Sequence, residues 1–156
     1  GINPSRQLVN AALGVFPATN IACWESLHRL AQFNSQGLPL FGGPNGYGIM
    51  QVDNPPVSNE GVWNWRQNVA EGLAIIAQKR ADAEGYPGRV KKTYPDATDF
   101  VALNLIDSET NRPYVVLETI QRYNGGSYWR WDNVTKVWVR SPPNDYVAKV
   151  LASSCP

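Results

Sequence analysis

Apolar residues recur every three or four positions over two long stretches of the chain, which is the period of an amphipathic helix. The first stretch predicts a helix over about 18–33. The second predicts a helix over about 63–83, which Gly85 and Pro87 should end, because neither residue favours a helix interior. Both helices carry one apolar face, so both are expected to pack against a core.

Four shorter stretches have a weaker helical pattern and are separated by Gly- and Pro-rich connections. In the first of them, Leu8, Ala11 and Ala12 form the expected apolar side. In the last, Asn144 is the expected N-cap, and Tyr146, Val147, Val150 and Leu151 are expected to point inward. The short predicted helices cover about Pro4–Leu13, Thr98–Ile106, Pro113–Tyr123 and the residues after Pro142-Pro143.

Two segments do not follow a helical period. The stretch "YWRWDNVTKVWVR", residues 128–140, alternates aromatic or β-branched residues with polar ones and predicts a β-hairpin with its turn near Asp132-Asn133. The stretch "GPNGYGIMQVDNPP", residues 43–56, reads as an irregular loop with a short strand. The expected fold class is therefore α+β, mainly α, with a small β-hairpin.

Composition limits the kind of protein. A chain of 156 residues, with 43% hydrophobic and 17% charged residues, fits one domain with one core and excludes a disordered charged tail. A net charge of +1 gives no case for nucleic acid. Within the predicted hairpin, only Arg130, Lys136 and Arg140 are cationic, so a nucleic-acid binder is the weakest class.

No segment is apolar for long enough to span a membrane. The uncharged stretch 31–52 is interrupted by Gly, Pro, Asn and Gln. No signal peptide is visible at the start. The chain begins with Gly1 rather than Met, which fits a processed chain or a piece cut from a longer protein.

The two cysteines, Cys23 and Cys155, allow two interpretations. They are either two buried thiols or one disulfide that ties the last helix to an early one. A disulfide would indicate an oxidising compartment and would stabilise the fold by roughly 4 kcal/mol. With His28 as the single histidine, the chain has too few ligands for a zinc cluster, and no metal or cofactor is expected.

Carboxylates are the remaining candidates for chemistry, since the chain has neither a nucleophile elbow nor a phosphate-binding loop. Glu25 lies within the apolar helical stretch "ACWESLHRL" and, two positions from Cys23, faces nearly the opposite way. Beside Trp24 and Leu27 this carboxyl should be partly desolvated, which raises a pKa and suits a general acid. The alternative is a glutamate at the polar boundary of an amphipathic helix.

Six tryptophans and seven tyrosines are many for this length. Aromatic rings stack on the apolar faces of sugars, so this content favours a sugar site. The alternative, favoured for each tryptophan taken singly, is packing. Trp63 and Trp65 would then lie in the core, and Trp129, Trp131 and Trp138 would stabilise the hairpin.

Taken in order, five motifs resemble one family. The chain looks like a member of the lysozyme superfamily, on the branch of goose-type lysozymes and soluble lytic transglycosylases. The resemblance spans about 22–151, while 85–112 and the hairpin lie outside its motifs. The motifs are "ES" at 25–26, "NGYGIMQVD" at 45–53, "NVAEGLAII" at 68–76, "RYNGG" at 122–126 and "NDYVAKVL" at 144–151.

The resemblance implies a single lysozyme-like catalytic domain over 1–156, with its β-hairpin or small sheet beside the cleft. It implies cleavage of the β-1,4 bond between N-acetylmuramic acid and N-acetylglucosamine in peptidoglycan. Glu25 matches the family's general acid. The residues that the resemblance places around the substrate are Ser26, Tyr47, Gln51, Tyr123, Asn124 and Tyr146.

Two mechanisms occur in this family, and a third reading involves no chemistry. An inverting hydrolase needs a second carboxylate roughly 6.5–9.5 Å from the acid to activate water, and Asp53 is the candidate. The loop "AQFNSQGLPLFGGPNG" contains no acid, although goose-type lysozymes have one there. The Asp53 carboxylate could instead cap the turn before Pro55. The alternatives are a lytic transglycosylase that uses Glu25 alone and a non-catalytic peptidoglycan- or chitin-binding module.

The resemblance also indicates the partners and the setting. Peptidoglycan glycan strands are the expected partner, with no nucleic acid and no membrane span, and the protein is expected to be a monomer. Its expected location is secreted, periplasmic or facing the cell wall. A phage lysin, a toxin domain, a remodelling enzyme and a defence lysozyme all fit this pattern.

Overall fold

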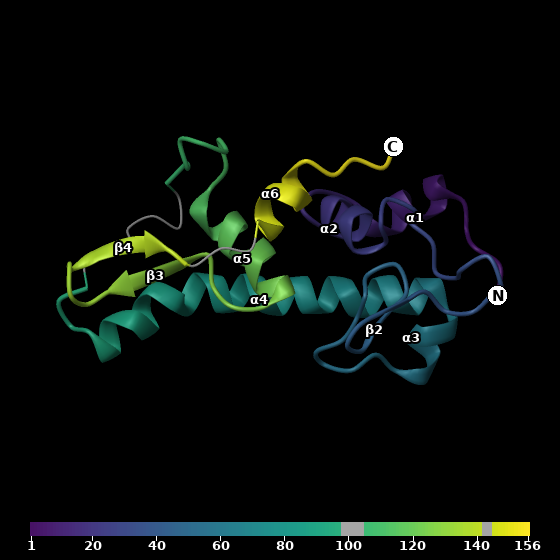
Figure 1. Ribbon diagram of the computed structural model, residues 1–156, viewed down its shortest axis with the longest axis horizontal. Helices are drawn as coiled ribbons and strands as arrows, with labels where there is room; N and C mark the ends of the chain where they lie inside the picture. The colour runs from purple at the N-terminus through teal and green to yellow at the C-terminus, as the bar shows by residue number, and fades with distance from the viewer. Residues whose placement is uncertain (98–104, 142–144) are drawn as a thin grey trace. The chain divides into compact units, whose positions relative to one another are not determined.

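The computed structural model describes residues 1–97, 105–141 and 145–156. The predicted fold class is confirmed: the protein is α+β and mainly helical, with 46% helix and 12% strand. The chain forms two compact units, Gly1–Ile75 with Ala148–Pro156 and the intervening Ile76–Val147. Figure 1 draws the elements of both units, and each unit is described by itself below. That the whole chain forms a single domain stays a prediction.

The first helix of the first unit is α1, Arg6–Leu13, close to the predicted range. Ser5 caps it, because its side chain accepts a hydrogen bond from the backbone N–H of Leu8. Its predicted apolar side was wrong by one position. Val9 and Leu13 are buried, whereas Leu8 is 49% exposed, Ala11 is exposed and Ala12 is half-buried.

The second helix, α2, covers Ala18–Glu25 and ends eight residues before the predicted Phe33. Leu27, His28 and Leu30 all have positive φ values, 55°, 63° and 48°, which no α-helix contains. The buried hydroxyl of Ser26 accepts a hydrogen bond from the Leu30 N–H at 2.9 Å and so replaces a helical partner. The Leu30 side chain is buried in this non-helical conformation, so its burial does not require the helix to continue.

The glycine-rich stretch contains a minimal hairpin, as predicted for an irregular loop with a short strand. Strand β1, Phe41–Gly42, pairs antiparallel with β2, Gly46–Tyr47. The chain then turns back on itself, because Val52 bridges to Tyr47. The segment 43–56 is therefore a folded loop that contains β2 and is held by the pairing of β2 with β1 and by the Tyr47–Val52 bridge.

A five-residue helix that the apolar pattern does not predict, α3, covers Asn59–Trp63. The Ser58 side chain caps it by accepting from the Gly61 N–H at 2.9 Å. The Glu71 carboxylate in turn accepts from both the N–H and the hydroxyl of Ser58, at 2.8 and 3.0 Å. These bonds fix the start of α3.

The long helix α4 covers Trp65–Thr93 and extends ten residues past the predicted end. It begins in the first unit and continues into the second. Gly85 and Pro87 were expected to stop it, but both lie inside the helix. Pro87 lacks the N–H that would bond the Ala83 carbonyl one turn earlier, and the Arg89 guanidinium donates to the neighbouring Asp82 carbonyl at 2.8 Å.

The second unit contains α5, Tyr114–Asn124, which agrees within one residue with the predicted range and has Gly125 as its C-cap. The predicted hairpin is also confirmed: β3, Trp129–Asp132, pairs antiparallel with β4, Val137–Arg140. The Asp132 carboxylate closes the turn by accepting from the N–H groups of the two residues at 134 and 135. Figure 1 shows β3 and β4 side by side.

The hairpin tryptophans pack as the alternative reading expected. Trp131 is buried, and its ring lies 5.8 Å from that of Trp138 in an edge-on contact. Tyr114 and Tyr128 make similar edge-on contacts with Trp129 at 4.9 and 5.2 Å. These rings form the core of the hairpin.

A buried carboxylate joins the hairpin to α5. Glu118 accepts hydrogen bonds from the backbone N–H of Tyr128 at 3.0 Å and of Trp129 at 3.1 Å, and from Arg122 Nε at 3.0 Å. Burial raises the pKa of Glu118, and the two N–H donors and the guanidinium only partly offset this effect. No pattern in the sequence indicates this role for Glu118.

The last helix, α6, covers Tyr146–Leu151. Tyr146, Val147 and Val150 are buried as expected, and Leu151 is half-buried. The predicted cap, Asn144, lies outside the described residues, as does nearly all of the predicted helix 98–106. No helix in the described ranges combines the length and the apolar character needed to cross a membrane.

Candidate functional site

A groove of about 650 Å³ lies in the first unit. One wall is the glycine-rich loop, and the other is the segment that leads into and forms α3. The groove combines aromatic, amide, carboxylate and apolar groups. Its lining residues are Pro39, Asn45, Tyr47, Asp53, Pro56, Val57, Asn59, Val62 and Trp63.

The buried side chain of Gln32 connects the two walls. Its Nε2 donates to the carbonyls of Gly61 at 3.1 Å and Val62 at 2.9 Å, both in α3. Its Oε1 accepts from the N–H of Ile49 in the loop at 3.2 Å. Because Gln32 is fully buried, these bonds are shielded from water and hold the walls at a fixed separation.

Asn68, on α4 and also fully buried, makes a second connection. Its Oδ1 accepts from the Met50 N–H at 2.9 Å, and its Nδ2 donates to the Tyr47 carbonyl at 2.8 Å and to the Gly61 carbonyl at 3.1 Å. One amide therefore bonds both the loop and α3. The hydrogen bond from Asn68 to the Tyr47 carbonyl fixes the position of the backbone at Tyr47.

The glycine at position 48 makes this arrangement sterically feasible. Gly48 has φ of 78°, a conformation that favours glycine. A Cβ at this position would lie 2.5 Å from amide atoms of both Gln32 and Asn68. The loop thus contains a glycine here because two buried amides approach its backbone.

Gln51, predicted to contact substrate, has its amide occupied within the loop. Its Nε2 donates to the carbonyls of Gly48 at 2.9 Å and Leu40 at 3.3 Å. Its φ is 49°, so Gln51 and Asp53 do not alternate along an extended strand. Gln51 supports the shape of the loop and is not one of the groove-lining residues.

Asp53 and Tyr47, both singled out from the sequence, line the same groove. Asp53 is half-buried, and within the described ranges no group donates a hydrogen bond to its carboxylate. The turn-capping alternative for Asp53 therefore has no hydrogen bond to support it. The Tyr47 ring is supported from one side by Phe41, with ring centroids 5.0 Å apart.

Glu25 is the last residue of α2 and is half-buried in the same unit. Among the described residues that line the groove, Glu25 is absent. Its neighbour Ser26 is fully buried, with its hydroxyl bonded to the Leu30 N–H and the Cys23 carbonyl. Ser26 therefore shapes the backbone directly after Glu25.

The remaining predicted site residues belong to the second unit. Tyr123 and Asn124 are the last two residues of α5; Tyr123 is half-buried and Asn124 is exposed. Tyr146 is the first residue of α6 and is buried. Their contact with a sugar stays a prediction.

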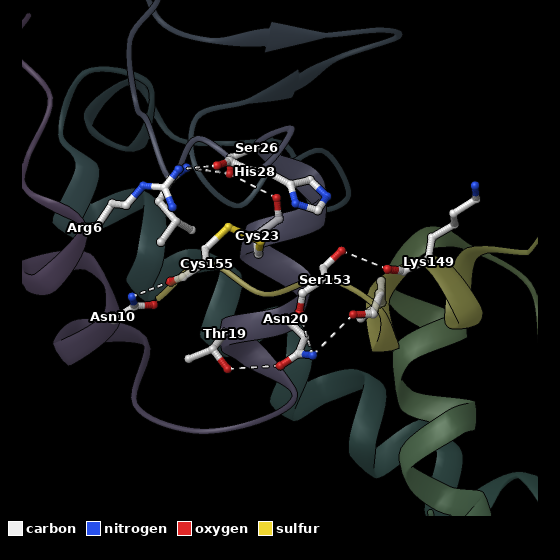
Figure 2. The surroundings of a disulfide bond; sticks show 12 residues. Arg6, Asn10, Thr19, Asn20, Cys23, Ser26, His28, Lys149, Ser153 and Cys155 are labelled. Atoms are coloured by element: carbon white, nitrogen blue, oxygen red, sulfur yellow. Dashed lines mark hydrogen bonds between the residues drawn. A yellow bond between two sulfur atoms is a disulfide. The ribbon is translucent and has the colours of Figure 1, made fainter. Parts of the chain in front are cut away.

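The cysteines are bonded, so the disulfide interpretation of the sequence is the correct one. Cys23 in α2 joins Cys155, with their Cα atoms 5.7 Å apart. Figure 2 shows how asparagines reinforce this bond: Asn10 donates to the Cys155 carbonyl, and Asn20 donates to the carbonyl of Ser153. The imidazole of His28 lies beside the two sulfurs. In the bonded state, however, the sulfurs are not thiolates and are poor metal ligands.

Four residues of this site escaped the sequence analysis or were misread. Trp63 was expected in the core but is 57% exposed at the groove. Asn59 lies outside every quoted stretch, and Gln32 lies in the quoted loop 31–46 without being singled out, although an amide between apolar neighbours is a signal of buried bonding. Asn68 begins the motif "NVAEGLAII", and its side chain could have been recognised as a buried polar group by its position on the apolar face of α4.

Comparison of the chain with protein-family models, with curated proteins and with solved structures finds no match.

Proposed function

We propose that this protein is a muramidase that cleaves the β-1,4 bond between N-acetylmuramic acid and N-acetylglucosamine in peptidoglycan. The observation that carries the proposal is that Tyr47 and Asp53, both from the motif "NGYGIMQVD", line one groove whose walls are fixed by buried amides. The resemblance of five ordered motifs to goose-type lysozymes and lytic transglycosylases supplies the reaction class.

In the proposed mechanism, Glu25 is the general acid. It donates its proton to the glycosidic oxygen as the bond from that oxygen to C1 breaks. Asp53 is the base: it accepts a proton from a water whose oxygen forms the new bond to C1. The absence of a hydrogen bond to the Asp53 carboxylate from the described residues supports this role, since its oxygens are available to a water.

A lytic transglycosylase is the second candidate. It uses Glu25 alone, first as acid and then as base for the 6-hydroxyl of the same sugar, and yields a 1,6-anhydro product. The observation in its favour is that Asp53 lines the groove and Glu25 does not. A transglycosylase, unlike an inverting hydrolase, does not need both carboxylates in one groove. Mass spectrometry of the released muropeptides separates the two reactions, because the anhydro product is lighter by one water.

The test of enzymatic activity is clearance of a peptidoglycan suspension. Wild type should clear it, and Glu25→Gln should lower the rate by roughly 10² or more, since the acid is removed at constant shape. Glu84→Gln, an exposed surface change in an i,i+4 pair with Arg80, is the matched control and should clear at the wild-type rate. Equal activity of Glu25→Gln and wild type would remove Glu25 from the mechanism.

Asp53→Asn tests the choice between hydrolysis and transglycosylation. If Asp53 activates water, turnover should fall roughly 10²-fold while the mass of any product stays that of the hydrolysed sugar. A near-normal rate with anhydro product would establish the transglycosylase alternative. If the wild type binds peptidoglycan but does not cleave it, the protein is a non-catalytic binding module.

The proposed setting is outside the cytoplasm: secreted, periplasmic or facing the cell wall, where the glycan strands are found. The Cys23–Cys155 disulfide supports it, because such bonds form and persist in oxidising compartments. A monomer with no cofactor completes the proposal.

A further inference from the structure

We infer that Trp63 is a specificity-determining residue of the groove: its exposed indole stacks on a sugar ring, and the amides of Asn59 and Asn45 bind the acetamido group. The inference deepens the proposed function and rests on it for the identity of the polymer. It assigns substrate selection to residues outside the motifs that support the reaction class.

The exposure of Trp63 is the first observation. A tryptophan at the end of a helix commonly buries its ring, yet Trp63 is 57% exposed. Its ring is nevertheless held in place, because Phe33, itself buried, lies 6.3 Å away between ring centroids at an interplanar angle of 34°. One face of the groove is thus an aromatic surface supported from behind.

The polar groups of the groove are the second observation. Asn45 and Asn59 are exposed, and no described residue bonds their side-chain amides. An amide both donates and accepts, which matches the C=O and N–H of an acetamido group. The groove lining contains no Lys or Arg among the described residues, so the groove favours a neutral hydroxyl-rich ligand over an anion.

The fixed position of α3 is the third observation. The Glu71 carboxylate holds Ser58, and Ser58 caps the helix that carries both Asn59 and Trp63. Gln32 and Asn68 hold the Gly61 carbonyl of the same helix. A site whose aromatic and amide groups are held before the ligand arrives binds with a smaller loss of conformational entropy.

Two ligands that differ in the acetamido group provide the test. Chitotetraose and cellotetraose share the β-1,4 backbone, and only chitotetraose carries acetamido groups. Calorimetric titration of the full chain, as wild type and as Glu25→Gln to prevent turnover, should give binding of chitotetraose roughly tenfold or more tighter than of cellotetraose. Intrinsic tryptophan fluorescence should change on binding.

Single substitutions then assign the selectivity to residues. Trp63→Ala should weaken binding of both ligands roughly tenfold or more and should abolish the fluorescence change, whereas Trp63→Phe should retain part of the affinity. Asn59→Ala should weaken chitotetraose alone. Trp65→Phe, a tryptophan outside the groove lining, is the control and should bind both ligands as wild type does. Thermal unfolding confirms that each variant is folded.

The outcomes separate this inference from the proposed function. Binding of chitotetraose that survives Trp63→Ala, or equal binding of the two ligands by wild type, overturns the inference even if peptidoglycan is cleaved. If binding depends on Trp63 and prefers acetamido sugars, but peptidoglycan is not cleaved, the inference is upheld and the proposed muramidase activity is contradicted. Binding of a proline-rich peptide to the same groove, with no binding of either sugar, overturns both.

Discussion

At the scale of single residues, the buried amides Gln32 and Asn68 determine the geometry of the groove. Neither side chain is in contact with solvent, and each bonds both the glycine-rich loop and α3. A buried amide that loses its partners costs far more than an exposed one, because no water replaces the lost bonds.

This asymmetry predicts different effects for two asparagines. Asn68→Ala removes the acceptor of the Met50 N–H and the donor to the Tyr47 and Gly61 carbonyls, so the free energy of unfolding should fall by about 2–4 kcal/mol. Asn59→Ala, at an exposed position, should change it by less than about 0.5 kcal/mol. Urea unfolding of both variants measures the difference, and equal losses would contradict the role of Asn68.

Glu118 predicts a pH dependence of stability. Burial raises its pKa in the folded state, so the folded protein binds its proton more readily than the unfolded chain does. The stabilising contribution of the protonated Glu118 carboxyl is therefore complete below its ordinary pKa of 4.5. This contribution is lost as the pH rises through the pKa of the folded state.

The measurement is the melting temperature of wild type relative to Glu118→Gln, taken in steps from pH 4 to pH 7. The melting temperature of the wild type should rise relative to that of Glu118→Gln as the pH falls, since glutamine does not titrate. A difference that grows with rising pH would reverse the sign and contradict the dominance of burial over the donors from Tyr128, Trp129 and Arg122.

Trp63 illustrates what sequence cannot determine at this scale. Its apolar character predicts burial, yet at the end of α3 it is exposed and lines the groove. Asp53 and Tyr47 were predicted to share a site because they share a motif, and both line the groove. The hydrogen bond from the Gln51 amide to the Leu40 carbonyl could not be predicted, because it depends on how the backbone before β1 folds next to Gln51.

At the scale of elements, the short helix α3 is the most informative part of the fold. It has five residues, too few for a stable helix alone, so its cap and its tertiary bonds hold it. It carries Asn59 and Trp63 to the groove and presents the Gly61 carbonyl to Gln32 and Asn68.

Removing the cap should therefore affect both stability and binding. Ser58→Ala deletes the bond to the Gly61 N–H and the hydroxyl bond to Glu71, and should lower the free energy of unfolding by about 1 kcal/mol. Ser35→Ala, at an exposed loop position, is the control and should be neutral. Urea unfolding measures the stability. A loss of stability without any loss of sugar affinity would show that the cap does not position Trp63.

Element boundaries show where sequence patterns succeed and fail. The ends of α5 and of the β3–β4 hairpin were predicted correctly, because Gly125 and Asp132 act through local backbone conformation and local bonds. The ends of α2 and α4 were not. After Glu25 the Ser26 hydroxyl accepts from the Leu30 N–H in a turn with positive φ values, and α4 continues through Pro87 despite the donor that a proline lacks.

At the scale of the whole molecule, the disulfide closes a loop of 132 positions between Cys23 and Cys155. It stabilises the folded protein mainly by limiting the unfolded chain. Three asparagine hydrogen bonds hold the same C-terminal segment against α1 and α2: Asn10 donates to the carbonyl of residue 155, and Asn20 donates to the carbonyls of residues 150 and 153.

The double variant Cys23→Ala/Cys155→Ala should lose roughly 4–5 kcal/mol of stability, the value expected for so long a loop. A dithiol reductant should lower the melting temperature of the wild type toward that of the variant and leave the variant unchanged. An unaffected melting temperature in both cases would show that the chain does not depend on the bond.

The first unit is discontinuous, since it consists of Gly1–Ile75 and Ala148–Pro156 with the whole second unit between them. A ribosome delivers the chain from its N-terminus, so every residue of the second unit is synthesised before the first unit is complete. The first unit, which contains the groove, therefore cannot close its Cys23–Cys155 bond until residues 148–156 have been synthesised.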